Sequence, residues 1–131
     1  MNLTVDHYAV RTMDMDKSIE FYCQKLGLKL ISKTVDKEHN EVFAFLKFDN
    51  AVLELIQGLE NTDLTAKPKI NPPYAPHLAI KTDDLESLLL LLVQKNIDIV
   101  KGPLEIKNRV KWLYIADPDN NIIEFVQWLD S

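Results

Sequence analysis

The sequence of 131 residues is poor in several features that mark whole classes of protein. Its single cysteine, Cys23, cannot form a disulfide within the chain, so nothing in the sequence indicates an oxidising compartment. Its three glycines do not form the glycine-rich loop that binds phosphates. The longest apolar run, 88–93, has six residues, whereas a membrane-spanning helix needs roughly 20. The sequence therefore excludes a disulfide scaffold and predicts no association with a membrane.

Basic residues are also outnumbered. Fifteen Lys and Arg residues face 20 Asp and Glu residues, which gives a formal charge of −5 and predicts no nucleic-acid partner. Residues 1–7 include Asp6 and lack the basic start and apolar stretch of a signal peptide. The content of 47% hydrophobic and 27% charged residues is typical of a folded globular protein. We expect a cytoplasmic protein.

The chain contains an internal repeat. Residues 7–14 match residues 77–84, and residues 49–57 match residues 119–127, both at an offset of 70. Eight of these 17 positions are identical, where residue usage predicts about one by chance. The sequence therefore indicates a tandem duplication of one unit of roughly 60 residues.

Both copies of the unit show the same order of elements. In the first, strands are expected at 3–12, 28–34, 41–48 and 51–57, with a helix capped by Asp14 or Asp16 and ended by Gly27. In the second, strands are expected at 75–82, 97–100, 110–116 and 121–128, with a buried leucine-rich helix that is capped by Asp83 and ends near Asn96. This predicts an α+β fold with two βαβββ modules, about 1–58 and 75–131, joined by a proline-rich linker at 59–74 within a single domain, 1–131.

Four polar side chains occupy equivalent places in otherwise apolar strands. His7 and Glu54 are 47 residues apart, and so are His77 and Glu124. A carboxylate between apolar strand neighbours is costly to bury unless its charge is compensated. If the two units pack about a pseudo-twofold axis, two imidazoles and two carboxylates converge, and such a set binds a divalent metal and leaves room for water.

Other interpretations apply to these residues taken singly. A lone strand histidine is usually hydrogen bonded in or near the core, a lone strand glutamate is usually solvated, and each His–Glu pair could be a purely structural ion pair. The occurrence of both residue types twice, in the same register, favours metal ligation. His39 has no counterpart in the repeat and is expected to be a solvated loop residue. Cys23 lies on the apolar stripe of the first helix and is expected to be a core residue rather than a nucleophile.

The chain resembles the vicinal oxygen chelate superfamily, which contains glyoxalase I, methylmalonyl-CoA epimerase, extradiol dioxygenases and fosfomycin- or bleomycin-resistance proteins. The resemblance covers essentially the whole chain. It is carried by His7, the segment 18–28 with Leu26-Gly27-Leu28, Glu54 in Leu-Glu-Leu, His77 in Pro-His-Leu-Ala, and Asp117-Pro-Asp before Glu124.

The resemblance implies a half-open, barrel-like sheet around a metal-binding cavity, and a homodimer. His, Glu, His, Glu is the ligand set of bacterial glyoxalase I, so His7, Glu54, His77 and Glu124 would bind one divalent metal per site. Nickel, cobalt and zinc are favoured, and manganese and iron are also compatible.

By the same resemblance, the substrate would be a small molecule, the hemithioacetal of a 2-oxoaldehyde with glutathione or another thiol. Glu54 and Glu124 would move a proton between adjacent carbons through a metal-stabilised ene-diolate. Arg11 would hold an anionic end of the substrate, and Lys81, its repeat counterpart, is expected to be a solvated charge.

Two departures bear on the substrate. Gly58 stands where glyoxalase I usually has an asparagine that contacts glutathione, and the segment 104–110 lacks the expected glycine-rich pattern. The superfamily also leaves other functions open. These are a metal-dependent epimerase, an extradiol dioxygenase, and a non-catalytic protein that binds an antibiotic.

Overall fold

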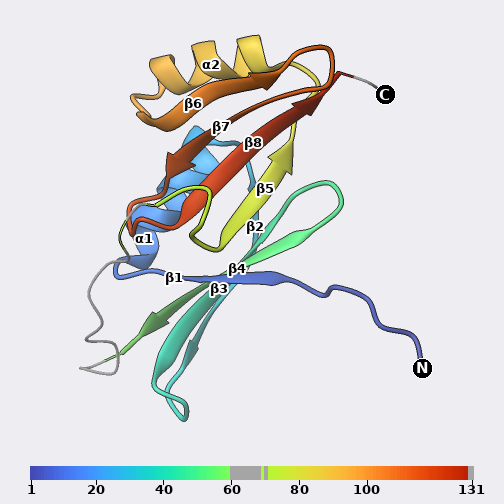
Figure 1. Cartoon of the computed structure of the whole chain (residues 1–131). Helices are drawn as coiled ribbons and strands as arrows, with labels where there is room; N and C mark the ends of the chain where they lie inside the picture. Colours follow the sequence, from blue (N-terminus) through green and yellow to red (C-terminus); the bar gives the residue numbers. More distant parts are fainter. Residues whose placement is uncertain (60–68, 70, 130–131) are drawn as a thin grey trace. The chain divides into compact units, whose positions relative to one another are not determined.

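The computed structural model describes residues 1–59, 69 and 71–129. The chain divides into two compact units, Met1–Lys67 and Pro68–Ser131. Each contains one four-stranded mixed sheet with a helical segment beside it (Figure 1). Of the expected linker 59–74, residues 60–68 and 70 lie outside the described part. Within that part, no helix has both the length and the apolar character needed to cross a bilayer.

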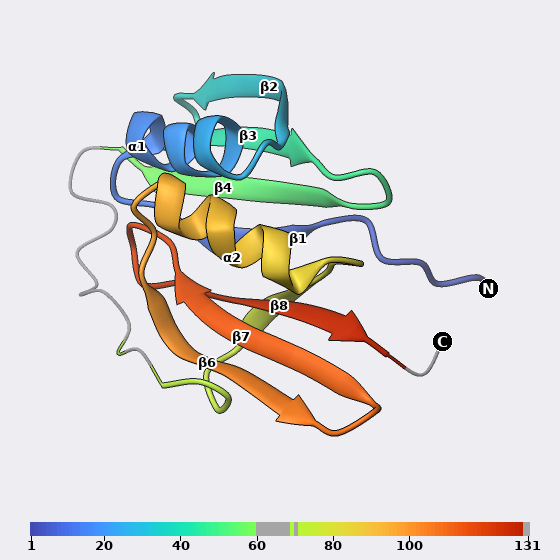
Figure 2. The ribbon, with the colours of Figure 1, turned by 90° about the horizontal axis from the view of Figure 1, so that it is seen from above.

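The two units have the same order of elements. The first consists of β1 (Tyr8–Arg11), α1 (Met15–Ile19), a π-helical turn η1 (Glu20–Lys25), β2 (Lys29–Asp36), β3 (Glu41–Lys47) and β4 (Val52–Gly58). The second consists of β5 (His77–Lys81), α2 (Leu85–Gln94), β6 (Ile99–Ile106), β7 (Val110–Ala116) and β8 (Ile122–Trp128). The strand orders are β1-β4-β3-β2 and β5-β8-β7-β6, and neither sheet closes into a barrel (Figure 2). The expected α+β fold with two βαβββ modules is confirmed.

Two strands differ in length from the sequence expectation. β1 begins at Tyr8 instead of Leu3, and the apolar side chains of Leu3 and Val5 are exposed. Alternation alone does not make a strand, because a strand also needs a neighbour for its backbone groups. β6 runs past Val100 because the ladder skips the Gly102–Pro103 step in a bulge. Gly102 has a φ of 104°, and a Cβ there would lie 3.0 Å from the Trp112 carbonyl oxygen.

The first helical segment is capped as expected but buries a different stripe. The Asp14 carboxylate accepts the Lys17 backbone N–H, and the chain leaves the segment at Gly27 with a φ of 85°. The Leu26 N–H bonds to the Phe21 carbonyl, an i to i+5 bond that shifts the phase of the final turn. As a result, Cys23 is half-buried and is not a core residue. The residues that are buried here are Met15, Ser18, Phe21 and Tyr22.

The second helix is amphipathic, so the expectation of a helix buried on all sides is wrong. Leu85 and Leu92 are buried, whereas Leu90 and Val93 are exposed. The cap is Asp84 rather than Asp83: its carboxylate accepts the Ser87 backbone N–H and the Ser87 hydroxyl. These bonds hold the pKa of Asp84 below its ordinary value. The helix ends at Gln94, close to the expected Asn96.

In each sheet, the glutamate of the last strand points away from the face that packs against the helix. In β4, Leu53 and Leu55 are buried on the face beside α1, while Glu54 points to the opposite face. In β8, Ile123 and Phe125 are buried in the same way, and Glu124 points to the opposite face. The register of the strands therefore places both glutamates on faces that the helices do not cover.

A glutamine from the last strand of each unit binds the start of that unit's helix. The side-chain carbonyl of Gln57 accepts the Met15 backbone N–H at 2.9 Å, and that of Gln127 accepts the Leu85 N–H at 3.0 Å. The Gln127 amide also donates to the Asp83 carbonyl at 3.0 Å. Both glutamines belong to the repeat, which explains why a polar residue recurs on the helix-facing side of these strands.

We predict that Gln127→Ala lowers the free energy of unfolding by about 1–2 kcal/mol, because the buried N–H of Leu85 loses its acceptor. Chemical denaturation followed by circular dichroism measures the change. Gln94→Ala, an exposed glutamine at the other end of the same helix, is the matched control and should change stability by less than about 0.5 kcal/mol. Equal stability of the two variants would contradict this role of Gln127.

Candidate metal centre

Each unit brings together the histidine and the glutamate that the sequence singled out. The His7 Nε2 atom lies 3.1 Å from Oε1 of Glu54, and the His77 Nε2 atom lies 3.0 Å from Oε1 of Glu124. The parallel pairing of β1 with β4, and of β5 with β8, places each histidine on the same face as its glutamate. The two pairs belong to different units and are equivalent in the repeat.

The second ring nitrogen of each histidine has an acceptor of its own. His77 Nδ1 lies 2.7 Å from the Ala75 carbonyl oxygen, and His7 Nδ1 lies 2.7 Å from the Asp6 carboxylate. A carbonyl oxygen only accepts, so Nδ1 of His77 must carry a proton and donate it. In a neutral imidazole, Nε2 then presents a lone pair to the Glu124 carboxylate.

Two acceptors facing each other at 3.0 Å need a proton or a bound cation between them. A histidine whose outer nitrogen donates to a carboxylate or a carbonyl is the arrangement found in metal sites, because it fixes the tautomer and aims the other nitrogen. The donor set of each unit therefore fits half of a divalent-metal site.

An aromatic ring packs against each histidine from the strand on the far side of the glutamate's strand, β3 or β7. Phe45 contacts His7 edge to face at a centroid distance of 5.6 Å, and Tyr114 contacts His77 at 5.5 Å. Phe45 lies opposite Glu54, and Tyr114 lies opposite Glu124, so these two positions are equivalent. Their offset is 69 rather than 70, because the β7–β8 connection at 117–121 is one residue longer than the β3–β4 connection at 48–51. A search at a constant offset therefore misses this pair.

The four candidate ligands are partly shielded from solvent. The glutamate side chains are 14% and 18% exposed for Glu54 and Glu124, and those of His7 and His77 are 32% and 20% exposed. The hydrogen bond with Asp6 raises the pKa of His7, although desolvation opposes this. Burial raises the pKa of Tyr114, and the charge of Glu124 adds to the effect.

The remaining histidine and the cysteine lie apart from these pairs. His39 is on the exposed turn between β2 and β3, where Nδ1 lies 2.8 Å from the Asp36 carboxylate. Burial raises the pKa of the Cys23 thiol, which makes it a poor nucleophile. Within the described ranges, no three or more His, Cys, Asp or Glu residues cluster so as to hold a metal. Each unit by itself supplies two candidate ligands.

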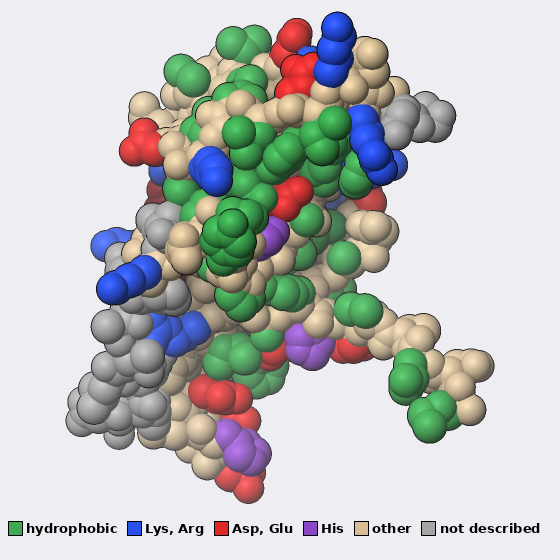
Figure 3. Space-filling model, viewed as in Figure 1, with side chains coloured by type: hydrophobic (Ala, Val, Ile, Leu, Met, Phe, Trp, Pro, Cys, Tyr) green, Lys and Arg blue, Asp and Glu red, His purple; other side chains and the backbone are tan. Residues whose placement is uncertain are grey.

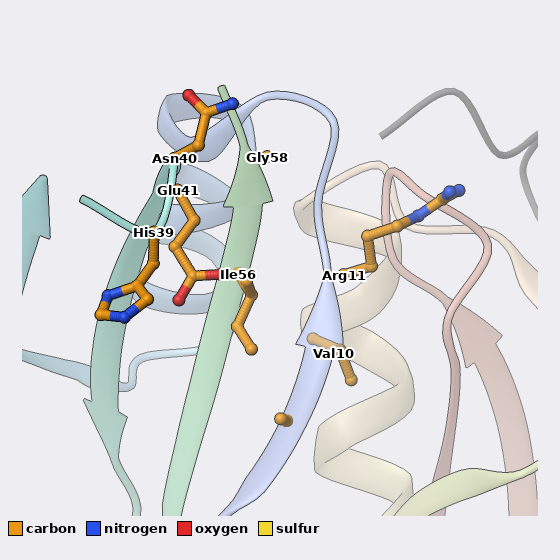
Figure 4. Close-up of a pocket in the computed structure, with 8 residues that line it drawn as sticks. Val10, Arg11, His39, Asn40, Glu41, Ile56 and Gly58 are labelled. Carbon is orange, nitrogen blue, oxygen red and sulfur yellow. The ribbon is translucent and has the colours of Figure 1, made fainter. Parts of the chain in front are cut away.

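Arg11, the predicted substrate contact, lines a pocket of about 330 Å³ in the first unit. Figure 4 shows this pocket at the end of the sheet, with Arg11 projecting from β1 away from Glu41 and His39. Gly58 forms another part of the wall and contributes no side chain. His39 and Glu41 therefore lie on one side of the pocket, and the Arg11 guanidinium points away from them.

We predict that Asp6→Asn lowers the pKa of His7 in the metal-free protein, because the hydrogen bond with the Asp6 carboxylate makes the largest contribution to raising it. Titration of the ring protons by nuclear magnetic resonance measures the change. His39, whose ring contacts Asp36, is the internal reference in the same spectra. An unchanged midpoint for His7 would show that Asp6 does not orient this ring.

Curated relatives with similar sequences share nearly the whole chain. A protein named probable lactoylglutathione lyase from Vibrio cholerae is 30% identical over 128 residues, which cover 96% of this chain and 91% of that protein. The lactoylglutathione lyase of Schizosaccharomyces pombe is 28% identical over 142 residues, covering 93% of this chain and 46% of that protein. Protein YwbC of Bacillus subtilis is 30% identical over 127 residues, covering 94% of this chain and 96% of that protein.

Solved structures give the same picture. The trypanothione-dependent glyoxalase I of Leishmania major superposes with a TM-score of 0.75 and 25% identity, covering 96% of this chain and 87% of that one. A glyoxalase family protein from Bacillus cereus superposes with a TM-score of 0.82 at 14% identity, covering 98% and 96% of the two chains, and shows the fold alone. Residues 4–125 match the family described as Glyoxalase/Bleomycin resistance protein/Dioxygenase superfamily. The chain belongs to this superfamily.

Proposed function

We propose that this protein is a divalent-metal-dependent isomerase of the glyoxalase I type. Its substrate would be the hemithioacetal of a 2-oxoaldehyde, and its product the thioester of a 2-hydroxy acid. The observation that carries the proposal is the duplicated His–Glu pair, in which each outer imidazole nitrogen is held by an acceptor. Relatives named lactoylglutathione lyase that match more than nine-tenths of this chain support the same reaction class.

The metal would be held by His7 and Glu54 from the first unit and by His77 and Glu124 from the second. The two pairs would come from one chain or from the two chains of a homodimer. Neutral imidazoles and carboxylates suit nickel, cobalt and zinc, and they also accept manganese and iron. When bound, a divalent cation supplies Lewis-acid stabilisation of the negative charge that develops on neighbouring substrate oxygens.

The glutamates would carry the proton. One carboxylate, Glu54 or Glu124, takes the proton from the carbon that bears sulfur; the electron pair of the broken C–H bond forms a C=C bond to the neighbouring carbon, and the π pair of that carbon's C=O bond moves onto its oxygen. A proton then returns to the neighbouring carbon, and the hydroxyl proton of the hemithioacetal moves to the oxygen on that carbon. The reaction consumes no oxidant and releases no leaving group, so the substrate and the product are isomers.

Arg11, at the edge of the pocket of the first unit, would bind an anionic end of the substrate through its guanidinium. Gly58, at the same pocket, offers no amide to a glutathione backbone. The thiol part of the substrate is therefore glutathione or another small thiol with an acidic group, and several thiols must be compared.

The direct test is turnover of methylglyoxal hemithioacetals after metal removal and reconstitution. We predict that the chelated protein is inactive and that at least one of nickel, cobalt, zinc, manganese and iron restores thioester formation with at least one thiol. No turnover across the whole panel would contradict the isomerase. Oxygen consumption with a catechol would identify a dioxygenase, and a metal-free protein that binds an antibiotic would identify a resistance protein.

Two variants separate the carboxylates from the rest of the site. Glu54→Gln and Glu124→Gln should each lower kcat, and the one that removes the proton-transferring base should lower it by roughly 10²–10⁴-fold. Glu105→Gln, an exposed glutamate on β6, is the control and should retain full activity. Full turnover in both site variants, with metal still bound, would exclude a carboxylate base.

A further inference from the structure

We propose that the second unit carries a binding groove for an apolar, ring-sized substituent of the substrate. This inference rests on the proposed function and narrows the substrate class. It favours hemithioacetals of 2-oxoaldehydes that carry an aromatic or branched apolar group over those of methylglyoxal. The groove lies beside Glu124, has a volume of about 410 Å³, and belongs entirely to the second unit.

The walls of the groove are almost wholly apolar. Lys101 and Glu124 are the charged residues among those that line it. The apolar and aromatic side chains that line it include Leu104, Ile106, Trp112, Tyr114, Val126 and Trp128. Figure 3 shows hydrophobic side chains gathered over β7 and β8, with acidic and histidine side chains among them. Pockets of this size and character bind small molecules with an apolar part.

The strand register makes the groove continuous with the candidate metal ligands. Glu124 lies opposite Tyr114, Val126 lies opposite Trp112, and Trp128 lies opposite Val110. Residues 124, 126 and 128 share one face of β8, so the apolar surface begins next to the Glu124 carboxylate and extends roughly 13 Å along the strand. A substrate whose oxygens lie near Glu124 therefore places a substituent of ring size against Trp112 and Val126.

The equivalent face of the first unit differs in chemistry at its outer end. Gly58 lies opposite Glu41 there, at the positions that Trp128 and Val110 occupy in the second unit. The first unit therefore has a carboxylate and a bare backbone where the second has an indole and an isopropyl group. Arg11 adds a cation on that side. One unit therefore has a surface that suits a charged end of the substrate, and the other has a surface that suits an apolar end.

The indole of Trp128 is the clearest part of the groove that a ligand would cover. Trp128 is 51% exposed, although β8 also contains four buried apolar residues. An aromatic ring placed against an exposed indole removes apolar surface from water and gains favourable ring contacts. The occupant that fits is therefore an aromatic or branched hydrocarbon group.

The protein provides its own probe, because its two tryptophans, Trp112 and Trp128, both line this groove. The binding test uses the metal-free full-length chain with 1-phenylethane-1,2-diol and propane-1,2-diol, which share a vicinal diol and differ in phenyl against methyl. We expect the phenyl compound to change the tryptophan emission and to saturate at a concentration at least tenfold lower than any at which the methyl compound has an effect. Equal responses, or none to the phenyl compound, would overturn the proposal.

Variants assign the response to the groove. Trp128→Ala should weaken binding of the phenyl diol about tenfold, while Trp128→Phe should retain most of it, with Trp112 still reporting. Leu90→Ala, which removes an exposed apolar side chain from α2, is the matched control and should bind as the original chain does. Undiminished binding in Trp128→Ala would also overturn the proposal, provided that circular dichroism shows a folded protein.

Turnover separates this inference from the proposed function. In the metal-loaded protein, Trp128→Ala should lower kcat/KM for the phenylglyoxal hemithioacetal about tenfold while leaving the methylglyoxal hemithioacetal of the same thiol within twofold. Equal losses for both substrates would contradict the groove and leave the isomerase standing. Selective binding of the phenyl diol without turnover of either substrate would contradict the isomerase and leave the groove standing.

Discussion

The contact on which the rest of the structure depends is an imidazole nitrogen facing a carboxylate oxygen at about 3 Å, present once in each unit. The far side of each ring faces an acceptor, the Asp6 carboxylate or the Ala75 carbonyl. The near nitrogen therefore faces its glutamate either across a proton or across a cation bound between them. The contact forms where β1 pairs with β4 and where β5 pairs with β8, because this parallel pairing sets the histidine and the glutamate side by side.

The fold accommodates this contact because side chains alternate along a strand, so a strand can pack one face in the core while its glutamate points to the other face. Leu53 and Leu55 bury one face of β4, and Glu54 between them is free to point to the other. The same division in β8 leaves Glu124 beside the apolar groove of the second unit. Both units thus keep the His–Glu pair after the duplication. They differ at the last residue of the glutamate's strand, which is Gly58 in β4 and Trp128 in β8.

Much of the fold could be predicted from the sequence because each element occurs twice, once in each copy of the repeat, and the two sequence patterns could be compared. The order βαβββ, the cap at Asp14, the end at Gly27 and the bounds of β7 follow from local patterns that tertiary packing did not override. Packing decided the rest: Leu3 and Val5 alternate without a partner strand, and the leucine-rich helix exposes Leu90. In the site, the His–Glu pairs could be predicted from equal spacing. The Ala75 carbonyl could not, since a backbone group leaves no mark in a sequence, and the partnership of Tyr114 with His77 was hidden by one extra residue in a turn.

The most direct test of the account is the amount of divalent metal that the purified full-length chain binds, measured by elemental analysis after loading and removal of excess metal. If both His–Glu pairs complete one centre, the chain binds about one cation per molecule, and His7→Ala and His77→Ala each lose most of it even though the variants change different units. If the original chain binds no divalent metal, or if either variant retains the full amount, the two pairs do not form a shared metal centre and the account is wrong.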